Sequence, residues 1–231
     1  MIGKLNFLEK STRLDLGYAA HQCARFSCDP KESHAVAVKR IGRYLKGTRD
    51  KGLILSPEDY SFEVFVDADH SGNWKIGECE DDAATAKSRT GYVIKYAGCP
   101  VVWHSKLQTC IALSSTEAEY VALSASLRDA IPMMQLLKEI QDLGYKVPTS
   151  TPVIHCRLFE DNSGALELAR VPKMRSRTKH MNLHYHHFRD FVARGLITIH
   201  PINTKDQPAD VLTKPLGDED FVKHRHTLLG W

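Results

Sequence analysis

Three β-rich runs follow one another in the first half of the chain, and together with what comes after them they constrain the fold more than any other feature. FEVFVDADH (62–70) alternates apolar and polar residues before it ends on carboxylates. GYVIKYAG (91–98) and CPVVWHS (99–105) meet at Ala97-Gly98, which predicts a β-hairpin. Strands of this kind, followed by alternating helices and strands, predict an α/β fold with a mixed sheet and helices on its faces.

Helical patterns surround these strands. Two amphipathic helices are predicted before them, over 11–28 and 31–47, separated by Asp29-Pro30. The chain of 231 residues is long enough for one good core and a smaller unit. The elements predicted after the hairpin are helices over 114–130 and 133–143 with Pro132 ending or kinking the first, a strand over 153–162, helices over 163–170 and 176–194, a strand over 196–202, and a last short helix over 208–214.

Composition excludes several other classes of protein. With 42% hydrophobic and 26% charged residues, disordered and fibrous chains are excluded. No window approaches the roughly 18 apolar residues of a membrane span, and no signal peptide is recognisable. The six cysteines form no C-x-x-C pair, so a reducing, intracellular compartment is expected. The net charge of +3 conceals two basic stretches, at 38–51 and 170–189.

This order of elements would bring four carboxylates close together. Asp67 ends the first strand, Glu119 lies in the first turns of the next helix, Asp161 ends the fourth strand and Asp210 opens the last helix. Ligand sites of open α/β sheets form at the carboxyl ends of strands. Four acids there would repel one another unless they shared divalent cations, and their hard oxygen ligands suit two Mg²⁺ or Mn²⁺ ions about 4 Å apart. The alternative for each acid is a helix cap or turn former.

The sequence around these acids resembles a known family. The matching segments, in order, are VDADHSGNW (66–74), SRTGYVIKYAGCPVVWHSKLQ (88–108), ALSSTEAEYVAL (112–123), FEDNSGALELA (159–169), RTKHMNLHYHHFRDFV (177–192) and TKDQPADVLTKPL (204–216). They resemble the C-terminal part of Ty1/copia-type retrotransposon polyproteins, in which a ribonuclease H domain follows the reverse transcriptase. The N-terminal GKLNFLEKSTRLDLGYAAHQCARF and HAVAVKRIGRYLKGT resemble the stretch that joins the polymerase's thumb region to the nuclease.

The resemblance implies a fold and a division of the chain. Residues 61–231 would form a ribonuclease H-like mixed five-stranded sheet flanked by helices. Residues 1–56 would be a small helical remnant of the reverse transcriptase thumb or connection region. The expected partners are an RNA/DNA hybrid and the remainder of the reverse transcriptase polyprotein, without a membrane. The expected location is cytoplasmic, in a virus-like particle, or nuclear.

The resemblance also implies an activity. A ribonuclease H would cut the RNA strand of RNA/DNA hybrids by a two-metal mechanism, leaving a 5′-phosphate and a 3′-hydroxyl. Asp67, Glu119, Asp161 and Asp210 match the catalytic and metal-binding acids of the family, with Glu117 as a close rival of Glu119. Nucleases of this kind often carry a histidine shortly before the fourth acid, and PINTKDQPA (201–209) has none. The alternative is a non-catalytic connection module of the same fold that binds template-primer.

Candidate nucleic-acid-binding residues flank the acids. Ser115, Thr116 and Asn162 are candidates by position, with helix caps as the alternative. The stretch 170–189 contains no acid, which suits the tracking of a phosphate backbone, although a solvated loop would also account for it. Its candidates are Lys173, Arg175, Arg177 and Lys179. The histidines of the same stretch are expected to have structural or backbone-contacting roles rather than to bind zinc, and they are His180, His184, His186 and His187.

Overall fold

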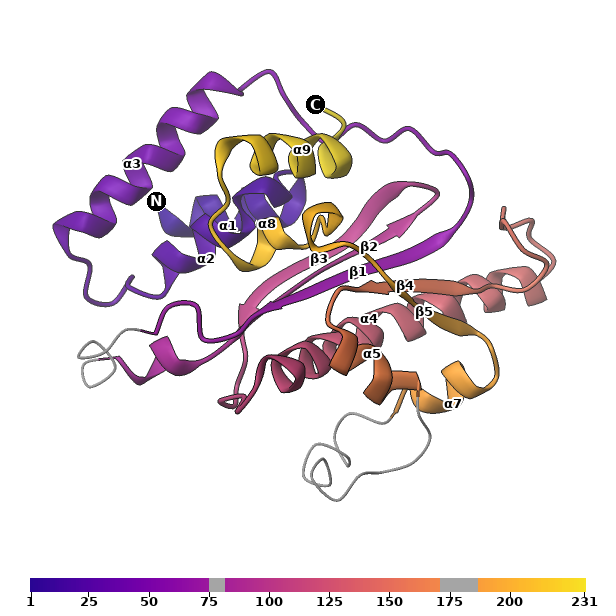
Figure 1. Ribbon diagram of the computed structural model, residues 1–231. Coiled ribbons are helices and arrows are strands. Elements are labelled where there is room, and N and C mark those ends of the chain that lie inside the picture. The colour runs from indigo at the N-terminus through magenta and orange to yellow at the C-terminus, as the bar shows by residue number, and fades with distance from the viewer. Residues whose placement is uncertain (75–81, 171–186) are drawn as a thin grey trace.

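The computed structural model describes residues 1–74, 82–170 and 187–231, and it confirms the predicted mixed sheet of five strands (Figure 1). The strand order is β3-β2-β1-β4-β5. The antiparallel part joins β1 to β2 and β2 to β3, and the parallel part joins β1 to β4 and β4 to β5. The strands are β1 (Phe62–Asp69), β2 (Arg89–Tyr96), β3 (Cys99–Leu107), β4 (Cys156–Glu160) and β5 (Ile197–Pro201).

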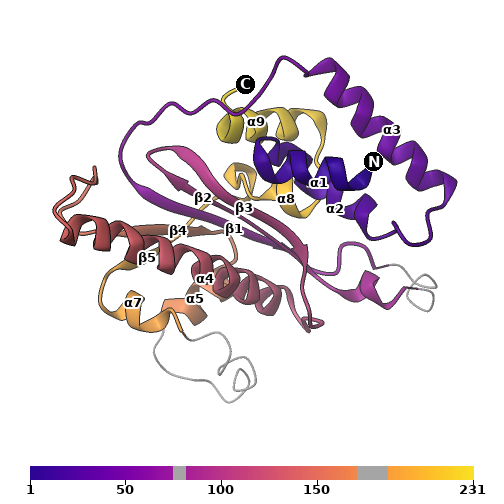
Figure 2. The same ribbon diagram turned by 180° about the vertical axis from the view of Figure 1, so that it is seen from behind.

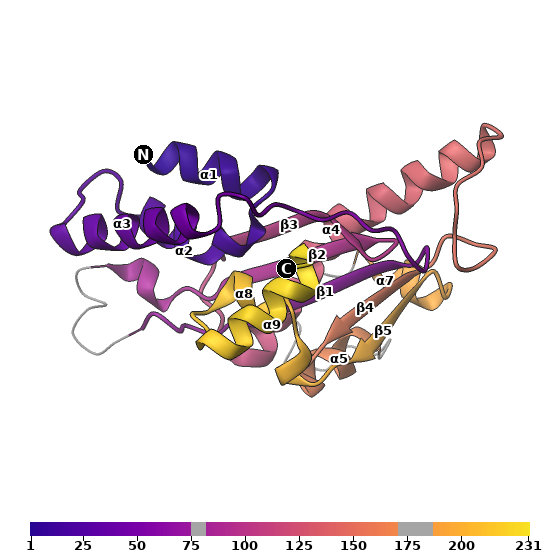
Figure 3. The same cartoon turned by 90° about the horizontal axis from the view of Figure 1, so that it is seen from above.

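Helices cover both faces of the sheet (Figures 1 and 2). One face carries α4 (Ser115–Asp142), α5 (Ser163–Arg170) and α7 (Arg189–Ala193). The other carries α1 (Ile2–Ser11), α2 (Gly17–Ala24), α8 (Asp210–Thr213) and α9 (Asp218–Leu229), as the view from above in Figure 3 shows. The helix α3 (Glu32–Gly47) packs against α2. Short 3-10 turns lie at η1 (Leu14–Leu16), η2 (Ala83–Ala86) and η4 (Thr204–Asp206).

Successive side chains of β1 pack into two different hydrophobic clusters, one on each face of the sheet. Val64 and Val66 of β1 are fully buried in the cluster that contains the apolar face of α4. Phe65, between them, packs on the opposite side in a cluster with Val93 and Leu212. Because successive side chains of a strand point to opposite faces, a strand covered on both sides is apolar at most positions, and in β1 Glu63 is the exception before Asp67.

Several predicted boundaries differ from the structure. The helix predicted over 11–28 is wrong in extent, because the chain forms α1 and α2 with the η1 turn between them. The helices predicted on either side of Pro132 are one helix, α4. Pro132 has no N–H to donate to the carbonyl of Arg128, and both residues are exposed. Of the helix predicted over 176–194, the described part is α7.

The helix α9 was not predicted, although its start carries a recognisable signal. Gly217 is its N-cap residue, and three acids occupy its first turn, where they suit the helix dipole. Among the described helices, none is long and apolar enough to cross a membrane.

Candidate functional site

Three of the four predicted acids converge at one end of the sheet. Asp67 lies in β1, Glu119 in the second turn of α4, and Asp161 directly follows β4. One carboxylate oxygen from each lies within 4.8 Å of the others. Asp67 and Glu119 are buried and Asp161 is partly exposed. The convergence follows from topology, because β1 and β4 are parallel neighbours whose carboxyl ends meet and α4 packs across β1.

Asp210 lies beside Asp67, and a lysine contacts both acids. The Nζ atom of Lys214 lies 2.9 Å from Asp210 Oδ1 and 3.8 Å from Asp67 Oδ2. The hydroxyl of Thr213 donates a short hydrogen bond to Asp67 Oδ2. We call Asp210, Thr213 and Lys214 the second set. They come from α8 and the residue after it, so this short helix places an acid, a hydroxyl and an ammonium group at the end of β1.

A glycine lets α8 approach the sheet this closely. Gly91 of β2 is paired with Asp67 in the register of the strands. A Cβ atom at Gly91 would lie 2.5 Å from Thr213 Cγ2 and 2.9 Å from Leu212 Cβ, so no other residue fits without moving α8. The buried side chain of Gln207 donates to Val66 O at 2.8 Å, and Ser105 Oγ donates to Leu212 O at 2.6 Å. These bonds fix α8 on the strands that it covers.

Burial makes the ionised forms of these acids costly. Desolvation, the largest cause, raises the pKa of Asp67 even though Lys214 opposes the rise. Burial and the charge of Asp67 raise the pKa of Asp210 to about 7. Burial, followed by the charge of Glu160, raises the pKa of Glu119 well above its usual value. The group therefore holds more negative charge than its surroundings stabilise.

The donor set fits a divalent metal ion. Three carboxylates within 4.8 Å offer hard oxygen ligands of the kind that Mg²⁺ and Mn²⁺ prefer. Glu119 Oε2 is buried and has no hydrogen-bond partner among the described residues. A cation would supply the missing partner and offset the repulsion between the acids. Asp69, two residues after Asp67, packs against the backbone of Gly72, and burial raises its pKa.

The prediction missed a fifth acid. Glu160 ends β4 and is fully buried, with its Oε1 accepting the Asn162 backbone N–H at 3.0 Å and its Oε2 without a partner among the described residues. Burial raises the pKa of Glu160 well above its usual value. The signal was present in the sequence, because Cys156, Leu158 and Glu160 alternate along β4 on its buried face.

The structure separates Glu117 from Glu119. Ser114 Oγ accepts the Glu117 backbone N–H at 3.1 Å, and Glu117 Oε2 accepts the Leu113 N–H at 2.8 Å, so both side chains cap the start of α4. Glu119, half a turn later, faces Asp67. The residue that points into the group of acids is therefore Glu119.

The uncharged nucleic-acid candidates lie at the starts of two helices. Asn162 Oδ1 accepts the Ala165 N–H at 3.0 Å and so caps α5, and it lies 3.4 Å from the Thr116 hydroxyl. Ser115 is exposed at the first position of α4. A Cβ atom at Gly164 would lie 2.6 Å from Thr116 Oγ1, which shows how tightly the two helix starts meet. Capping accounts for Asn162 without any ligand.

Most of the predicted basic surface falls outside the described residues. Lys173, Arg175, Arg177 and Lys179 lie there, as do His180, His184 and His186. His187 is described, and its ring packs edge-on against Phe188 at 5.6 Å. The other basic stretch forms the outer side of α3, where four of its side chains are exposed, namely Lys39, Arg40, Arg43 and Lys46.

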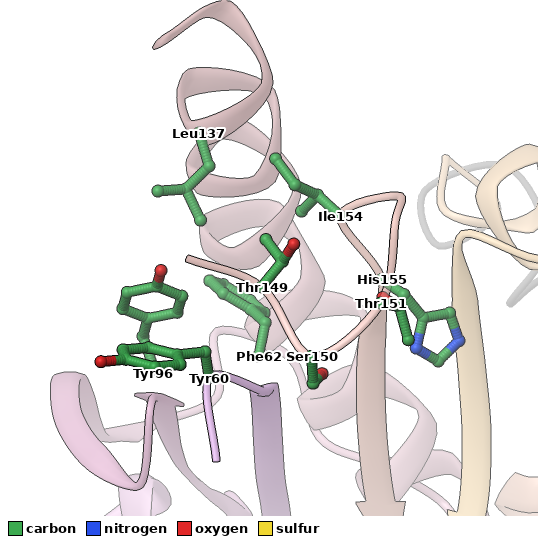
Figure 4. A pocket seen from close by; sticks show the side chains of 9 residues that line it. All are labelled: Tyr60, Phe62, Tyr96, Leu137, Thr149, Ser150, Thr151, Ile154 and His155. Carbon is green, nitrogen blue, oxygen red and sulfur yellow. The ribbon is translucent and has the colours of Figure 1, made fainter. Parts of the chain in front are cut away.

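A small pocket lies at the opposite end of the sheet from the acids (Figure 4). Phe62 at the start of β1, Tyr96 at the end of β2 and Leu137 of α4 surround it, together with the segment before β4. It brings together aromatic, aliphatic and hydroxyl side chains with one histidine, His155. The described residues that line it include no carboxylate.

Comparison with known sequences and structures identifies proteins that are similar to this chain. No protein-family model matches the chain. The chain is 34% identical over 220 residues to the retrovirus-related Pol polyprotein from transposon TNT 1-94 of Nicotiana tabacum, and 36% identical over 222 residues to that from transposon RE1 of Arabidopsis thaliana. These matches cover 95% and 96% of the chain but only 15% and 14% of the two polyproteins. The N-terminal ribonuclease H domain of a Mycobacterium tuberculosis protein, solved as a fusion, matches 73% of this chain and 99% of that one, with 12% identity and a TM-score of 0.40.

Proposed function

We propose, from the premise that the chain belongs to the Pol polyprotein family of Ty1/copia-type retrotransposons, that it is a ribonuclease H which cuts the RNA strand of RNA/DNA hybrids. The observation that supports this most is the convergence of Asp67, Glu119 and Asp161 within 4.8 Å, with Asp210 beside them. A chain retained only for binding would gain nothing from several buried carboxylates that destabilise one another.

The acids would act as ligands for two divalent ions. Asp67 is central, because it belongs to the set with Glu119 and Asp161 and also shares Lys214 with Asp210. When bound, the metal ions supply activation of the attacking water and stabilisation of the leaving 3′ oxygen. The protein's own contribution is to hold the carboxylates on rigid elements, with Thr213 fixing the orientation of Asp67 and Gln207 fixing the approach of α8.

Recognition of the hybrid would use the residues around the acids. Ser115, Thr116 and Asn162 border the acids at the starts of α4 and α5, where a side-chain hydroxyl or amide could reach a ribose 2′-hydroxyl. Phosphate contacts would come from the basic stretch with Lys173, Arg175, Arg177 and Lys179, and such contacts make binding weaker as salt is raised. Since the chain spans about a seventh of its curated relatives, the remainder of the polyprotein is the proposed partner, with residues 1–56 belonging to the thumb or connection region.

The proposal is tested by cleavage of a hybrid whose RNA strand is labelled, in Mg²⁺, with Glu119→Gln and Glu117→Gln as a matched pair. We expect Glu119→Gln to lower the rate at least about 100-fold, equivalent to about 3 kcal/mol of activation free energy. Glu117→Gln keeps a hydrogen-bonding cap and is expected to change the rate by less than about tenfold. A wild-type chain that binds the hybrid but leaves the RNA intact would overturn the proposal in favour of the non-catalytic connection module.

A further inference from the structure

Lys214 places a positive charge inside the group of acids, in the half that contains Asp210. Its Nζ atom lies 2.9 Å from Asp210 Oδ1 and 3.8 Å from Asp67 Oδ2. The lysine side chain is 33% exposed, whereas those of the two acids are 7% and 4% exposed. The ammonium group therefore enters a buried pair of carboxylates from the solvent side.

Among the described residues, no cation forms an ion pair with Glu119 or Asp161, the two acids that complete the other half of the group. Asp67, Glu119 and Asp161 bring oxygen atoms within 4.8 Å of one another, and Glu119 Oε2 is buried without a hydrogen-bond partner among the described residues. The two halves share Asp67 but differ in what neutralises them. Asp210 forms an ion pair with Lys214, whereas Glu119 and Asp161 form none among the described residues.

We propose that Lys214 is a built-in counter-ion of the Asp67–Asp210 pair, so that divalent cations enter the site in a fixed order. This inference rests on the proposed function, since it concerns the same metal-binding acids. The first ion binds beside Asp67, Glu119 and Asp161. The second binds only after the Lys214 ammonium has left Asp210, because a divalent ion and an ammonium group within about 4 Å of each other repel strongly at the low effective dielectric of a buried site.

The local structure allows the lysine to leave without unfolding its surroundings. Lys214 is the C-cap residue of α8 and has an extended backbone, so its four-carbon side chain can swing toward solvent while α8 stays in place. Thr213 continues to donate its hydrogen bond to Asp67 when the ammonium group moves. The arrangement thus keeps the two acids paired before the second ion arrives and releases them afterwards.

Binding of Mn²⁺ alone, counted from the electron paramagnetic resonance signal of the free ion, tests the order of binding without nucleic acid. Wild type is expected to bind one ion tightly and a second at least about tenfold more weakly. Lys214→Met keeps the aliphatic stem and removes the charge. It is therefore expected to tighten the binding of the second Mn²⁺ ion at least about tenfold, so that the affinities for the two ions become more similar. Lys214→Arg, which keeps the charge, is expected to preserve the gap.

Two controls isolate the contact with Asp210. Lys223→Met removes a lysine that pairs with Asp206 on the surface, and it is expected to leave both affinities within about twofold of wild type. In an Asp210→Asn background, which lacks the second ligand set, Lys214→Met is expected to add no second ion. Equal affinities in wild type, or equal tightening of both ions by Lys214→Met, would overturn the inference. Failure of hybrid cleavage, measured separately, would overturn the proposed function and leave the metal-binding order intact.

Discussion

Asp210 shows how one buried side chain can make the stability of the whole chain depend on pH. Burial and the nearby charge of Asp67 raise its pKa from 3.8 to about 7 in the folded state. A carboxyl group with a raised pKa binds its proton more tightly in the folded chain than in the unfolded one. Its stabilising contribution is therefore fully present below about pH 3.8 and is lost as the pH rises through about 7.

The prediction is that the metal-free chain becomes less stable between pH 5.5 and pH 8, and that Asp210→Asn reduces this loss because the amide cannot ionise. Urea unfolding of wild type and of Asp210→Asn at the two pH values measures how much stability each chain loses. Asp206→Asn is the control, since Lys223 lowers the pKa of this exposed acid and it is ionised throughout the range. If Asp210→Asn loses as much stability over this range as wild type does, the raised pKa of Asp210 is not the cause.

At the scale of elements, the site depends on how closely α8 approaches β2. Gly91→Ala would place a methyl group 2.5 Å from Thr213 Cγ2, so α8 must shift away from the sheet. We expect a loss of about 1–3 kcal/mol in the free energy of unfolding, as for other overpacked cores. We also expect weaker Mn²⁺ binding, because Asp210 moves with α8.

The matched control is Gly42→Ala in the middle of α3, where an added methyl group meets nothing within 4 Å. Here the free energy of unfolding is expected to rise by about 0.5–1 kcal/mol, because alanine loses less backbone entropy than glycine on folding. Equilibrium denaturation and Mn²⁺ titration of both variants measure the contrast. A Gly91→Ala chain with wild-type stability and metal affinity would show that α8 is free to adjust.

The contrast between these glycines also explains how much of the site the sequence could predict. The strands, the hairpin and the placement of Asp67 in the last residues of a strand followed from patterns within one segment, although β1 continues to Asp69 rather than ending at Asp67. The contact of Lys214 with both Asp67 and Asp210 did not, because it depends on the close approach of Gly91 and Thr213, which are far apart in the chain. Patterns within one segment report which face is buried, whereas the closeness of two segments depends on side-chain volumes in both.

At the scale of the whole molecule, the N-terminal segment and the helix α9 share a core with the sheet. Leu14 of η1 is fully buried in one cluster with Val93 of β2 and with Leu228 and Leu229 of α9. Figure 1 shows α1, α2 and α9 together over the same face of the sheet. The N-terminal segment is therefore packed against the sheet, and the two are expected to unfold together.

Trp231 lies at the centre of this contact. The guanidinium groups of Arg13 and Arg225 lie over its ring, at 5.2 and 4.2 Å from the ring centroid. Its Nε1–H donates to Gly52 O at 2.7 Å, in the linker before β1. One side chain thus joins the N-terminal segment, the linker and α9 through two cation–π contacts and a hydrogen bond.

Trp231→Ala is expected to lower the free energy of unfolding by about 2–3 kcal/mol, because it removes partly buried aromatic surface as well as these contacts. Trp74→Ala, at a side chain that is 49% exposed, is expected to stay within about 0.5 kcal/mol of wild type. Far-ultraviolet circular dichroism reports the helices. Tryptophan fluorescence includes the signal of Trp103, whose Nε1–H donates to Glu9 O at the contact between α1 and β3. Coincident transitions by both probes in wild type and in Trp231→Ala are expected of one cooperative unit. If there are two separate transitions and the substitution shifts the midpoint of only one of them, the N-terminal helices and the sheet fold independently.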